Sequence, residues 1–320
     1  MACCRVPTNQ VFFTDLDGTL LDHRTYAWSA ARPALRALAR RQQPLVIVTS
    51  KTRAEVLPLL CKLERREPFV VENGGAIYVP VGYFPFRIAD ADRAGRGWQR
   101  VALGTPYQML VAALRTAALR AGVSVQGFNQ MPAREVAVRT GLELTAARRA
   151  RRREVDEAFI ILDGDRRAWP RLRAEIRRLG LRTTRGSRFF HIMGANDKGV
   201  AVRRLRAWFE RLCGSPVRAV GLGNSPNDIP MLRAVTVPVL VARPGGRYDA
   251  ETSAAVPNAR RAGGIGPQGW NRAVLCLLRG QGLDGLRQAA VCHCYRTSRS
   301  AATGTRSAPG APPDTTCAPR

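Results

Sequence analysis

An apolar run ends in two aspartates separated by one residue in the segment Val11-Phe12-Phe13-Thr14-Asp15-Leu16-Asp17-Gly18-Thr19-Leu20. Its first four residues show no alternation of apolar and polar side chains, which predicts a short strand buried on both faces. The two aspartates then follow at the carboxyl end of that strand. At this spacing their carboxylates can converge on one cation or on one substrate atom.

The same pattern recurs further along the chain and predicts the fold class. Pro44–Thr49 and Phe69–Val71 are apolar runs of strand length, and helical patterns separate the successive strands. Buried strands separated by helices are typical of a parallel sheet covered on both faces. Ligands bind such sheets at the carboxyl ends of the strands, where we expect Asp15, Thr49 and Asn73. We therefore predict an α/β fold with a doubly wound parallel-sheet core.

This rhythm changes between Gly82 and Arg188. Helical patterns at Pro106–Arg120 and Trp169–Leu179 accompany one strand-like run at Phe159–Leu162. After about residue 281 the chain becomes rich in Ser, Thr, Ala, Pro and Arg, a composition typical of disorder. We therefore predict three parts: a sheet-bearing core over 1–81 and 189–280, an inserted α+β cap domain over 82–188, and a disordered tail over 281–320.

The charge of the chain is strongly positive, with 51 lysines and arginines against 24 acidic residues and a formal net charge of +27. Such a charge would suit a nucleic-acid partner. The basic residues are arginines apart from Lys51, Lys62 and Lys198, and they spread along the whole length. We interpret them as a coding bias with solvated helix faces and expect no nucleic-acid partner.

The apolar segments of the chain bear on its cellular location. No uninterrupted apolar segment approaches the ~18 residues that would span a bilayer, and the N-terminus does not resemble a signal peptide. We therefore expect a cytoplasmic protein without membrane contact. The sequence makes no prediction of oligomeric state.

Asp15 and Asp17 suit the chemistry of phosphoryl transfer. A carboxylate that attacks phosphorus forms an acyl-phosphate, and a neighbouring acid can protonate the leaving oxygen and later activate water. The repulsion between carboxylate and phosphate must be relieved, and Mg²⁺ fits because it binds one or two carboxylates together with phosphate. The alternative is a turn at Asp17-Gly18 that Asp15 caps. The following Gly18-Thr19-Leu20 after an apolar strand favours the catalytic interpretation.

Three other segments offer companions to these aspartates. Thr49 and Ser50 precede a predicted helix, where hydroxyls and backbone N–H groups can hold a phosphate, although a simple N-cap by Ser50 is the alternative. Lys198 opens another predicted helix and can place a positive charge beside phosphate. Asn224 and Asp228 follow a predicted strand and offer oxygen ligands to the same cation, or else shape an Asn/Pro turn.

The four motifs of the haloacid dehalogenase-like phosphatases resemble, in order and spacing, four parts of this chain: Asp15–Thr19, Thr49, Lys198 and Gly223–Asp228. The insertion between the second and third motifs resembles the cap of that superfamily. Within it, Arg153–Phe159 and Arg188–Gly194 resemble the mannosyl-3-phosphoglycerate phosphatases more closely. This resemblance implies Mg²⁺-dependent hydrolysis of 2-O-mannosyl-3-phosphoglycerate to mannosylglycerate and phosphate through an aspartyl-phosphate, in compatible-solute biosynthesis.

The resemblance also implies a role for each matching residue. Asp15 is expected to be the nucleophile and Asp17 the general acid and base. Phosphate binding is expected from Thr49, Ser50 and Lys198, and metal binding from Asp15, Asp17, Asn224 and Asp228. Substrate contacts at the cap and rim are expected from Lys51, Asn73, Arg188 and His191. One departure is that the last motif usually begins Gly-Asp, whereas this chain has Gly223-Asn224.

Two alternative functions remain open at this stage. One is a related phosphatase of the same capped class, acting on glucosyl-3-phosphoglycerate or sucrose phosphate. The other is a non-catalytic polyanion-binding protein on a haloacid dehalogenase scaffold, which the charge and Asn224 would suit. Against the second stand the four retained motif residues Asp15, Asp17, Thr49 and Lys198, which a binding protein has no need to keep.

Overall fold

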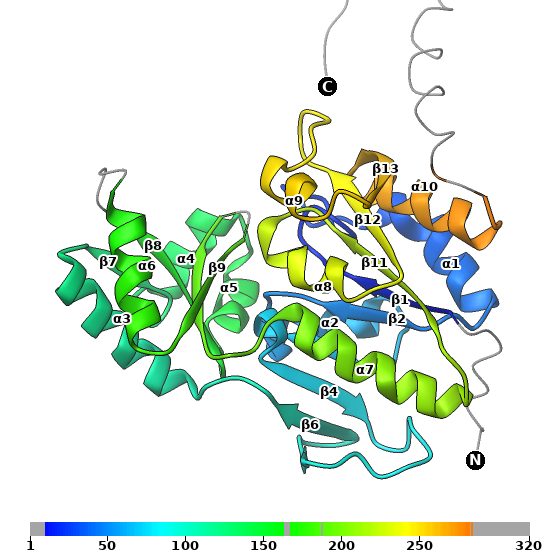
Figure 1. The fold of residues 1–320 in the computed structure, drawn as a ribbon, viewed down its shortest axis with the longest axis horizontal. Coiled ribbons are helices and arrows are strands. Elements are labelled where there is room, and N and C mark those ends of the chain that lie inside the picture. The colour runs from blue at the N-terminus through cyan, green and yellow to red at the C-terminus, as the bar shows by residue number, and fades with distance from the viewer. Residues whose placement is uncertain (1–9, 163–166, 187, 282, 284–320) are drawn as a thin grey trace, which may run out of the picture.

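The computed structural model describes residues 10–162, 167–186, 188–281 and 283. Within these ranges the chain forms two sheets, each covered by helices (Figure 1). The tail that we predicted over 281–320 lies outside the described residues except at positions 281 and 283.

The larger sheet has nine strands and confirms the α/β class. Its order is β13 (Arg260–Ile265), β12 (Val237–Ala242), β11 (Arg218–Gly223), β1 (Gln10–Thr14), β2 (Leu45–Val48), β3 (Phe69–Val71), β4 (Ala76–Pro80), β6 (Trp98–Ala102) and β5 (Ala91–Arg93). The strands from β13 to β3 pair in parallel. The last three pair antiparallel and extend one side of the sheet.

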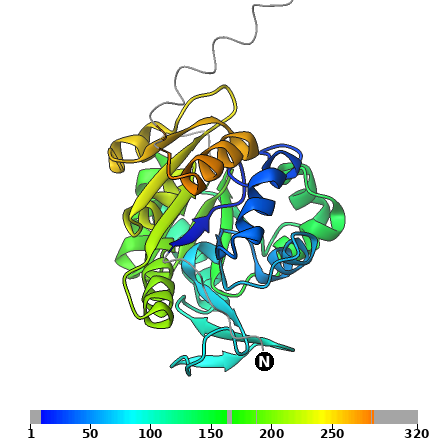
Figure 2. The same ribbon diagram turned by 90° about the vertical axis from the view of Figure 1, so that its right-hand side faces the viewer.

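Both faces of this sheet are buried, which explains the unbroken apolar run of β1. Side chains of a strand alternate between faces: Phe12 packs in one core cluster, and Val11 and Phe13 pack in the other. On the Phe12 face lie α1 (Arg32–Arg40), α2 (Arg53–Lys62) and α10 (Gly266–Leu278), of which α1 and α10 are neighbours (Figure 2). The other face carries α7 (Lys198–Cys213), α8 (Ile229–Arg233) and the end of α9 (Ala250–Ala255).

The smaller sheet has four antiparallel strands, in the order β7 (Val125–Gly127), β8 (Asp156–Ile161), β10 (Phe190–Met193) and β9 (Arg182–Arg185). Two core clusters hold its helices. One joins α3 (Tyr107–Ala121) to α6 (Ala168–Arg178), and the other contains α4 (Ala133–Thr140) and α5 (Leu144–Ala150). In Figure 1 this unit lies beside the nine-stranded sheet at the left.

Sheet membership leads us to propose different limits for the inserted unit. Strands β5 and β6 lie within the predicted range 82–188 but pair in the nine-stranded sheet, and β10 lies beyond that range but pairs in the four-stranded sheet. The stretch before β6 is polar and glycine-rich, so its pattern carries little strand signal. We propose that the inserted unit spans about 103–194.

Within the described ranges, each helix is too short or too polar to cross a membrane. The cytoplasmic location stays a prediction.

Candidate active site

Four neighbouring strands bring three of the predicted site residues, Asn224, Asp15 and Thr49, to one edge of the large sheet. β11, β1, β2 and β3 lie side by side and run parallel. The residues that follow their carboxyl ends are Asn224, Asp15, Thr49 and Glu72. Parallel strands deliver their carboxyl ends to one edge, so the structure brings together residues from positions that are far apart in the sequence.

Lys198 joins two carboxylates at the centre of this edge. It is the first residue of α7 and is 1% exposed. Its Nζ donates to Asp15 Oδ1 and to Asp228 Oδ1, at 2.6 Å each. The other oxygen of Asp228, Oδ2, accepts from the backbone N–H groups of Asn224 and Ser225 at 2.9 and 3.0 Å. Both oxygens of Asp228 are therefore engaged within the protein.

The charges at this centre favour an additional cation. Burial and repulsion from Asp228 raise the pKa of Asp15 to about 7, although Lys198 opposes the rise. Burial alone would lower the pKa of Lys198, but attraction to Asp15 and Asp228 raises it. Two carboxylates thus share one ammonium group, which leaves one excess negative charge when both are ionised.

Asp17 is held at the rim of the same edge by Lys51. Lys51 Nζ lies 3.0 Å from Asp17 Oδ2 and 3.6 Å from a carboxylate oxygen of Glu55. It also lies 4.8 Å from the ring centroid of Tyr26. The sequence analysis did not identify Glu55 or Tyr26; the spacing Thr52-x-x-Glu55, which forms a capping box, was the available signal for Glu55.

Asn224 is placed to serve as a metal ligand. Its Nδ2 donates to the backbone oxygen of Asp17 at 3.1 Å, and its Oδ1 is buried without a hydrogen-bond partner, as is Asp17 Oδ1. Gly18 is in the left-handed region (φ 74°), and a Cβ there would lie 2.4 Å from Asn224 Nδ2, so the loop needs glycine for this approach.

The donor set as a whole fits Mg²⁺, which prefers oxygen ligands. It combines the carboxylate of Asp15, the backbone oxygen of Asp17 and the unpartnered amide oxygen of Asn224. One of these three ligands is an amide, and no group of three or more His, Cys, Asp and Glu side chains suited to a metal occurs in the described part of the chain.

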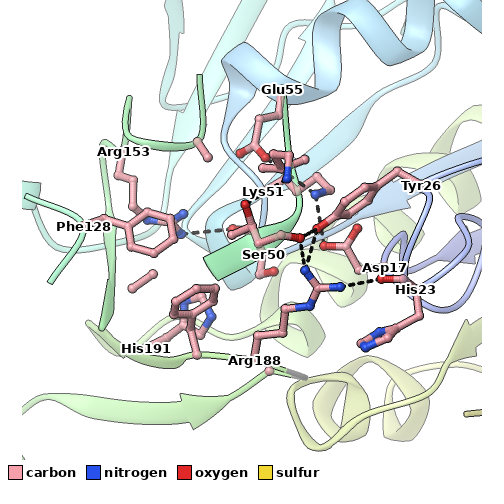
Figure 3. Close-up of a pocket in the computed structure, with 16 residues that line it drawn as sticks. Asp17, His23, Tyr26, Ser50, Lys51, Glu55, Phe128, Arg153, Arg188 and His191 are labelled. Atoms are coloured by element: carbon pink, nitrogen blue, oxygen red, sulfur yellow. Dashed lines mark hydrogen bonds and ion pairs between the residues drawn. The ribbon is translucent and has the colours of Figure 1, made fainter. Parts of the chain in front are cut away.

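A pocket of about 590 Å³ of empty space lies next to Asp17, between residues of the two sheets (Figure 3). The large-sheet unit contributes Asp17, His23, Tyr26, Ser50, Lys51 and Glu55. The inserted unit contributes apolar groups, among them Phe128 and Phe189, and the cations Arg153 and Arg188. Figure 3 shows His191, Phe128 and Arg153 on one side and Asp17, His23 and Tyr26 on the other. A pocket with this composition suits a small anionic ligand.

Arg188 connects the two walls of the pocket. Its Nη2 donates to the backbone oxygen of His23 at 2.6 Å, and its Nη1 donates to Tyr26 Oη at 3.0 Å and to the backbone oxygen of Thr140. The ion pairs in the described residues give acidic partners to Lys51 and Arg153, but none to Arg188. Arg188 is therefore the lining cation whose charge is best available to a ligand.

The remaining predicted residues divide between the pocket and the protein interior. Ser50, Lys51 and His191 line the pocket. Thr49 is buried, and its Oγ1 accepts from the backbone N–H of Lys51 at 3.2 Å. Asn73 is 1% exposed and is not among the lining residues, since its side chain is bound within the protein.

Comparisons with known proteins agree with this geometry. A family model described as haloacid dehalogenase-like hydrolase matches residues 12–83. A glucosyl-3-phosphoglycerate/mannosyl-3-phosphoglycerate phosphatase of Methanococcoides burtonii is 42% identical over 268 residues, which cover 84% of this chain and 97% of the relative. A phosphatase of the same name from Persephonella marina is 37% identical over 269 residues, with the same coverage of each chain.

The solved structures agree on the fold. A sugar phosphatase of haloacid dehalogenase subclass IIB matches with a TM-score of 0.58 and 16% identity, over 87% of this chain and 99% of its own. These relationships confirm the resemblance seen in the four sequence motifs. The chain belongs to the haloacid dehalogenase-like phosphatases, in the family of the glucosyl-3-phosphoglycerate/mannosyl-3-phosphoglycerate phosphatases.

Proposed function

We propose that the protein hydrolyses 2-O-mannosyl-3-phosphoglycerate, and its glucosyl counterpart, to the glycosylglycerate and inorganic phosphate. The observation that carries this proposal is Asp15 paired with Lys198 at the carboxyl end of β1, close to a pocket with an available cation, Arg188. Such a substrate has a phosphate that can bind at Asp15 and Lys198 and a carboxylate that can bind Arg188. This chain matches two relatives over 97% of their length, and both are named as phosphatases of these two compounds, which supports this substrate class.

The chemistry that we propose has two steps. An oxygen of Asp15 attacks phosphorus, the bond from phosphorus to the glycerate oxygen breaks, and Asp17 gives that oxygen a proton. Water then attacks the phosphorus of the aspartyl-phosphate while Asp17 takes up a proton from the water. The bond from phosphorus to the Asp15 oxygen breaks, which restores the Asp15 carboxylate and releases inorganic phosphate. Throughout, Lys198 and the hydroxyls of Thr49 and Ser50 would hold the transferred group, which spreads its negative charge over positive and hydrogen-bonding partners.

We further propose Mg²⁺ as the cofactor, held by Asp15, the backbone oxygen of Asp17 and Asn224. When bound, it would reduce the repulsion between the Asp15 carboxylate and the substrate phosphate. We assigned Asp228 to the metal from the sequence, and that role stays a prediction. Its contacts favour a different one, because Lys198 and two backbone N–H groups occupy its oxygens.

The proposed role of Asn224 predicts how metal affinity responds to charge. Asn224→Asp adds a carboxylate to the site, and Mg²⁺ affinity depends on carboxylate charge. We expect the Mg²⁺ concentration at half-maximal activity to fall by roughly tenfold, with a smaller change of kcat at saturating metal. Calorimetric titration with Mg²⁺ checks the affinity independently of activity.

Asp228→Asn serves as the comparison for Asn224→Asp. If the Asn224→Asp variant keeps the wild-type Mg²⁺ midpoint and Asp228→Asn abolishes Mg²⁺ binding, then Asn224 only shapes the turn and Asp228 is the ligand.

Arg188 is the proposed partner of the glycerate carboxylate. Arg188→Ala removes a charge-assisted hydrogen bond, which typically corresponds to about a 10- to 100-fold change in binding. We expect KM to rise by that factor for a phosphoglycerate substrate and far less for a small aryl phosphate, which has no carboxylate. Arg152→Ala, at an exposed position that does not line the pocket, is the control. Equal rises for both substrates would place Arg188 outside carboxylate recognition.

A phosphate-release assay over a panel of substrates tests the proposed function directly. The panel contains mannosyl- and glucosyl-3-phosphoglycerate, sucrose phosphate, 3-phosphoglycerate and an aryl phosphate, each with and without Mg²⁺. We expect the highest kcat/KM for the two glycosyl phosphoglycerates and no turnover after chelation. A preference for sucrose phosphate, or release that is unaffected by chelation, contradicts the proposal.

A further inference from the structure

A buried carboxylate lies directly behind the pocket wall. Asp156, the first residue of β8, is 0% exposed. Its Oδ1 accepts from Arg153 Nη2 at 2.6 Å and lies 2.8 Å from His191 Nδ1. Its Oδ2 accepts from Asn73 Nδ2 at 2.7 Å. Neither Asp156 nor Asn73 lines the pocket, whereas His191 and Arg153 do.

The charge of Asp156 decides which nitrogen of His191 carries hydrogen. Burial alone would raise the pKa of Asp156, but interaction with His191, the charge of Arg153 and the hydrogen bond from Asn73 hold that pKa below its ordinary value. An ionised carboxylate only accepts hydrogen bonds, so the Nδ1 of His191 must be the donor. In the neutral ring, Nε2 is then without hydrogen and is an acceptor, because the partner of one ring nitrogen fixes the state of the other.

The cluster is tied to the phosphate-binding edge. Asn73 Oδ1 accepts from Asn227 Nδ2 at 3.1 Å, in the loop that carries Asp228. Arg153 Nη2 also donates to the backbone oxygen of Ser50 at 3.0 Å. Arg153 already balances the charge of Asp156, so the ring of His191 can be neutral without leaving a buried charge unpaired. Both ties fix the position of His191 relative to the site of phosphoryl transfer.

The pocket around His191 has the chemistry of a sugar site. A Cβ built on Gly186 would lie 3.5 Å from Nε2, so this nitrogen lies beside a residue that lines the pocket together with His191. Phe128 and Phe189 pack edge to face with centroids 4.9 Å apart and line the same wall. The long side chains Arg153 and Arg188 on this wall are donors only. An acceptor for hydroxyl hydrogens therefore has to come from another residue.

We propose that Asp156 is a positioning residue that holds His191 with its Nε2 as the acceptor for a hydroxyl group of the substrate's sugar. This inference rests on the proposed function. In a 2-O-glycosyl-3-phosphoglycerate every free hydroxyl belongs to the sugar, because the two glycerate oxygens carry the sugar and the phosphate. The dyad of His191 and Asp156 therefore recognises the sugar, while Arg188 recognises the carboxylate.

The state of the ring can be observed directly. The chain has three histidines, His23, His191 and His293, so the spectrum of protein with ¹⁵N-labelled histidine is simple to assign with a His191→Phe variant. We expect the neutral ring of His191 to carry its hydrogen on Nδ1 and none on Nε2. In Asp156→Asn this preference should be lost, because the new amide can donate to Nδ1. A neutral ring with its hydrogen on Nε2 in the wild-type protein overturns the proposal.

The role in recognition is measured by a ratio of KM values. The comparison is between mannosyl-3-phosphoglycerate and 3-phosphoglycerate, which lacks the sugar. We expect His191→Phe and Asp156→Asn to raise KM for the first relative to the second by roughly tenfold, as for the loss of one hydrogen bond. Asn73→Gly keeps the left-handed backbone (φ 56°) and removes one contact to Asp156, so it should raise the ratio less.

Glu157→Gln is the matched control. Glu157 is the neighbour of Asp156 on β8 and is also 0% exposed, but its oxygens accept from Tyr107 and Asn129. The Glu157→Gln variant should have the same KM ratio as the wild type. If Asp156→Asn does not fold, His191→Phe and Asn73→Gly decide the kinetic question. If the wild type hydrolyses glycosyl phosphoglycerates but every variant keeps the wild-type KM ratio, only the proposed role of the dyad is wrong. If the wild type does not hydrolyse glycosyl phosphoglycerates, the proposed function is wrong.

Discussion

Asp15→Asn is expected to abolish phosphate release and to leave the fold unchanged. Asparagine is nearly the same size but offers no carboxylate to attack phosphorus, and loss of a nucleophile in other enzymes costs on the order of 10⁴- to 10⁶-fold in kcat. Lys198 keeps its bond to Asp228, so the buried ammonium group remains paired. Phosphate release and the thermal unfolding midpoint, measured on the same preparation, check both parts of the expectation.

Two comparisons separate loss of the nucleophile from general damage. Asp92→Asn, at an exposed position of β5, should behave as wild type. Asp17→Asn should slow glycosyl phosphoglycerate hydrolysis by about 10²- to 10⁴-fold. With an aryl phosphate, whose leaving group needs no proton, Asp17→Asn should give a rapid first release followed by slow turnover. Near-native turnover in a folded Asp15→Asn protein rules out the covalent route through this residue.

The parts of the fold that the sequence predicted are those with strong local signals. Val11–Thr14 and Val237–Ala242 are apolar without alternation because helices cover both faces, and this pattern survives in any single window of sequence. The position of Asp15, Thr49 and Asn224 at one edge followed from the same signal, since polar residues directly after such strands must meet at one edge of a parallel sheet.

The parts that could not be predicted depend on contacts between distant segments. Strands β5 and β6 are short and polar, and only their pairing with β4 makes them part of the large sheet. Asn73 was expected at the pocket rim, but Asp156, 83 positions later, holds its side chain in the interior. Neither residue carries a local pattern that distinguishes a buried polar cluster from a solvated turn.

Lys198→Met is expected to cost both stability and catalysis. The substitution leaves Asp15 and Asp228 buried and facing one another without the cation that both contact at 2.6 Å. Removing one member of a buried ion pair typically lowers the free energy of unfolding by about 3–5 kcal/mol. Lys62→Met, at an exposed position of α2, is the matched control and should leave stability and kcat near wild type. Chemical denaturation and phosphate release measure the two effects.

A double variant separates the two roles of this lysine. In Lys198→Met/Asp228→Asn only one buried carboxylate remains, so part of the lost unfolding free energy should return. Turnover should not return, because no ammonium group is left to stabilise the transferred phosphoryl group. Added Mg²⁺ should likewise stabilise Lys198→Met more than wild type, because the cation would compensate the excess negative charge at Asp15. If the double variant is as unstable as Lys198→Met, repulsion between the two carboxylates is not what the lysine relieves. If it recovers full activity, the proposed contact of Lys198 with the phosphoryl group is wrong.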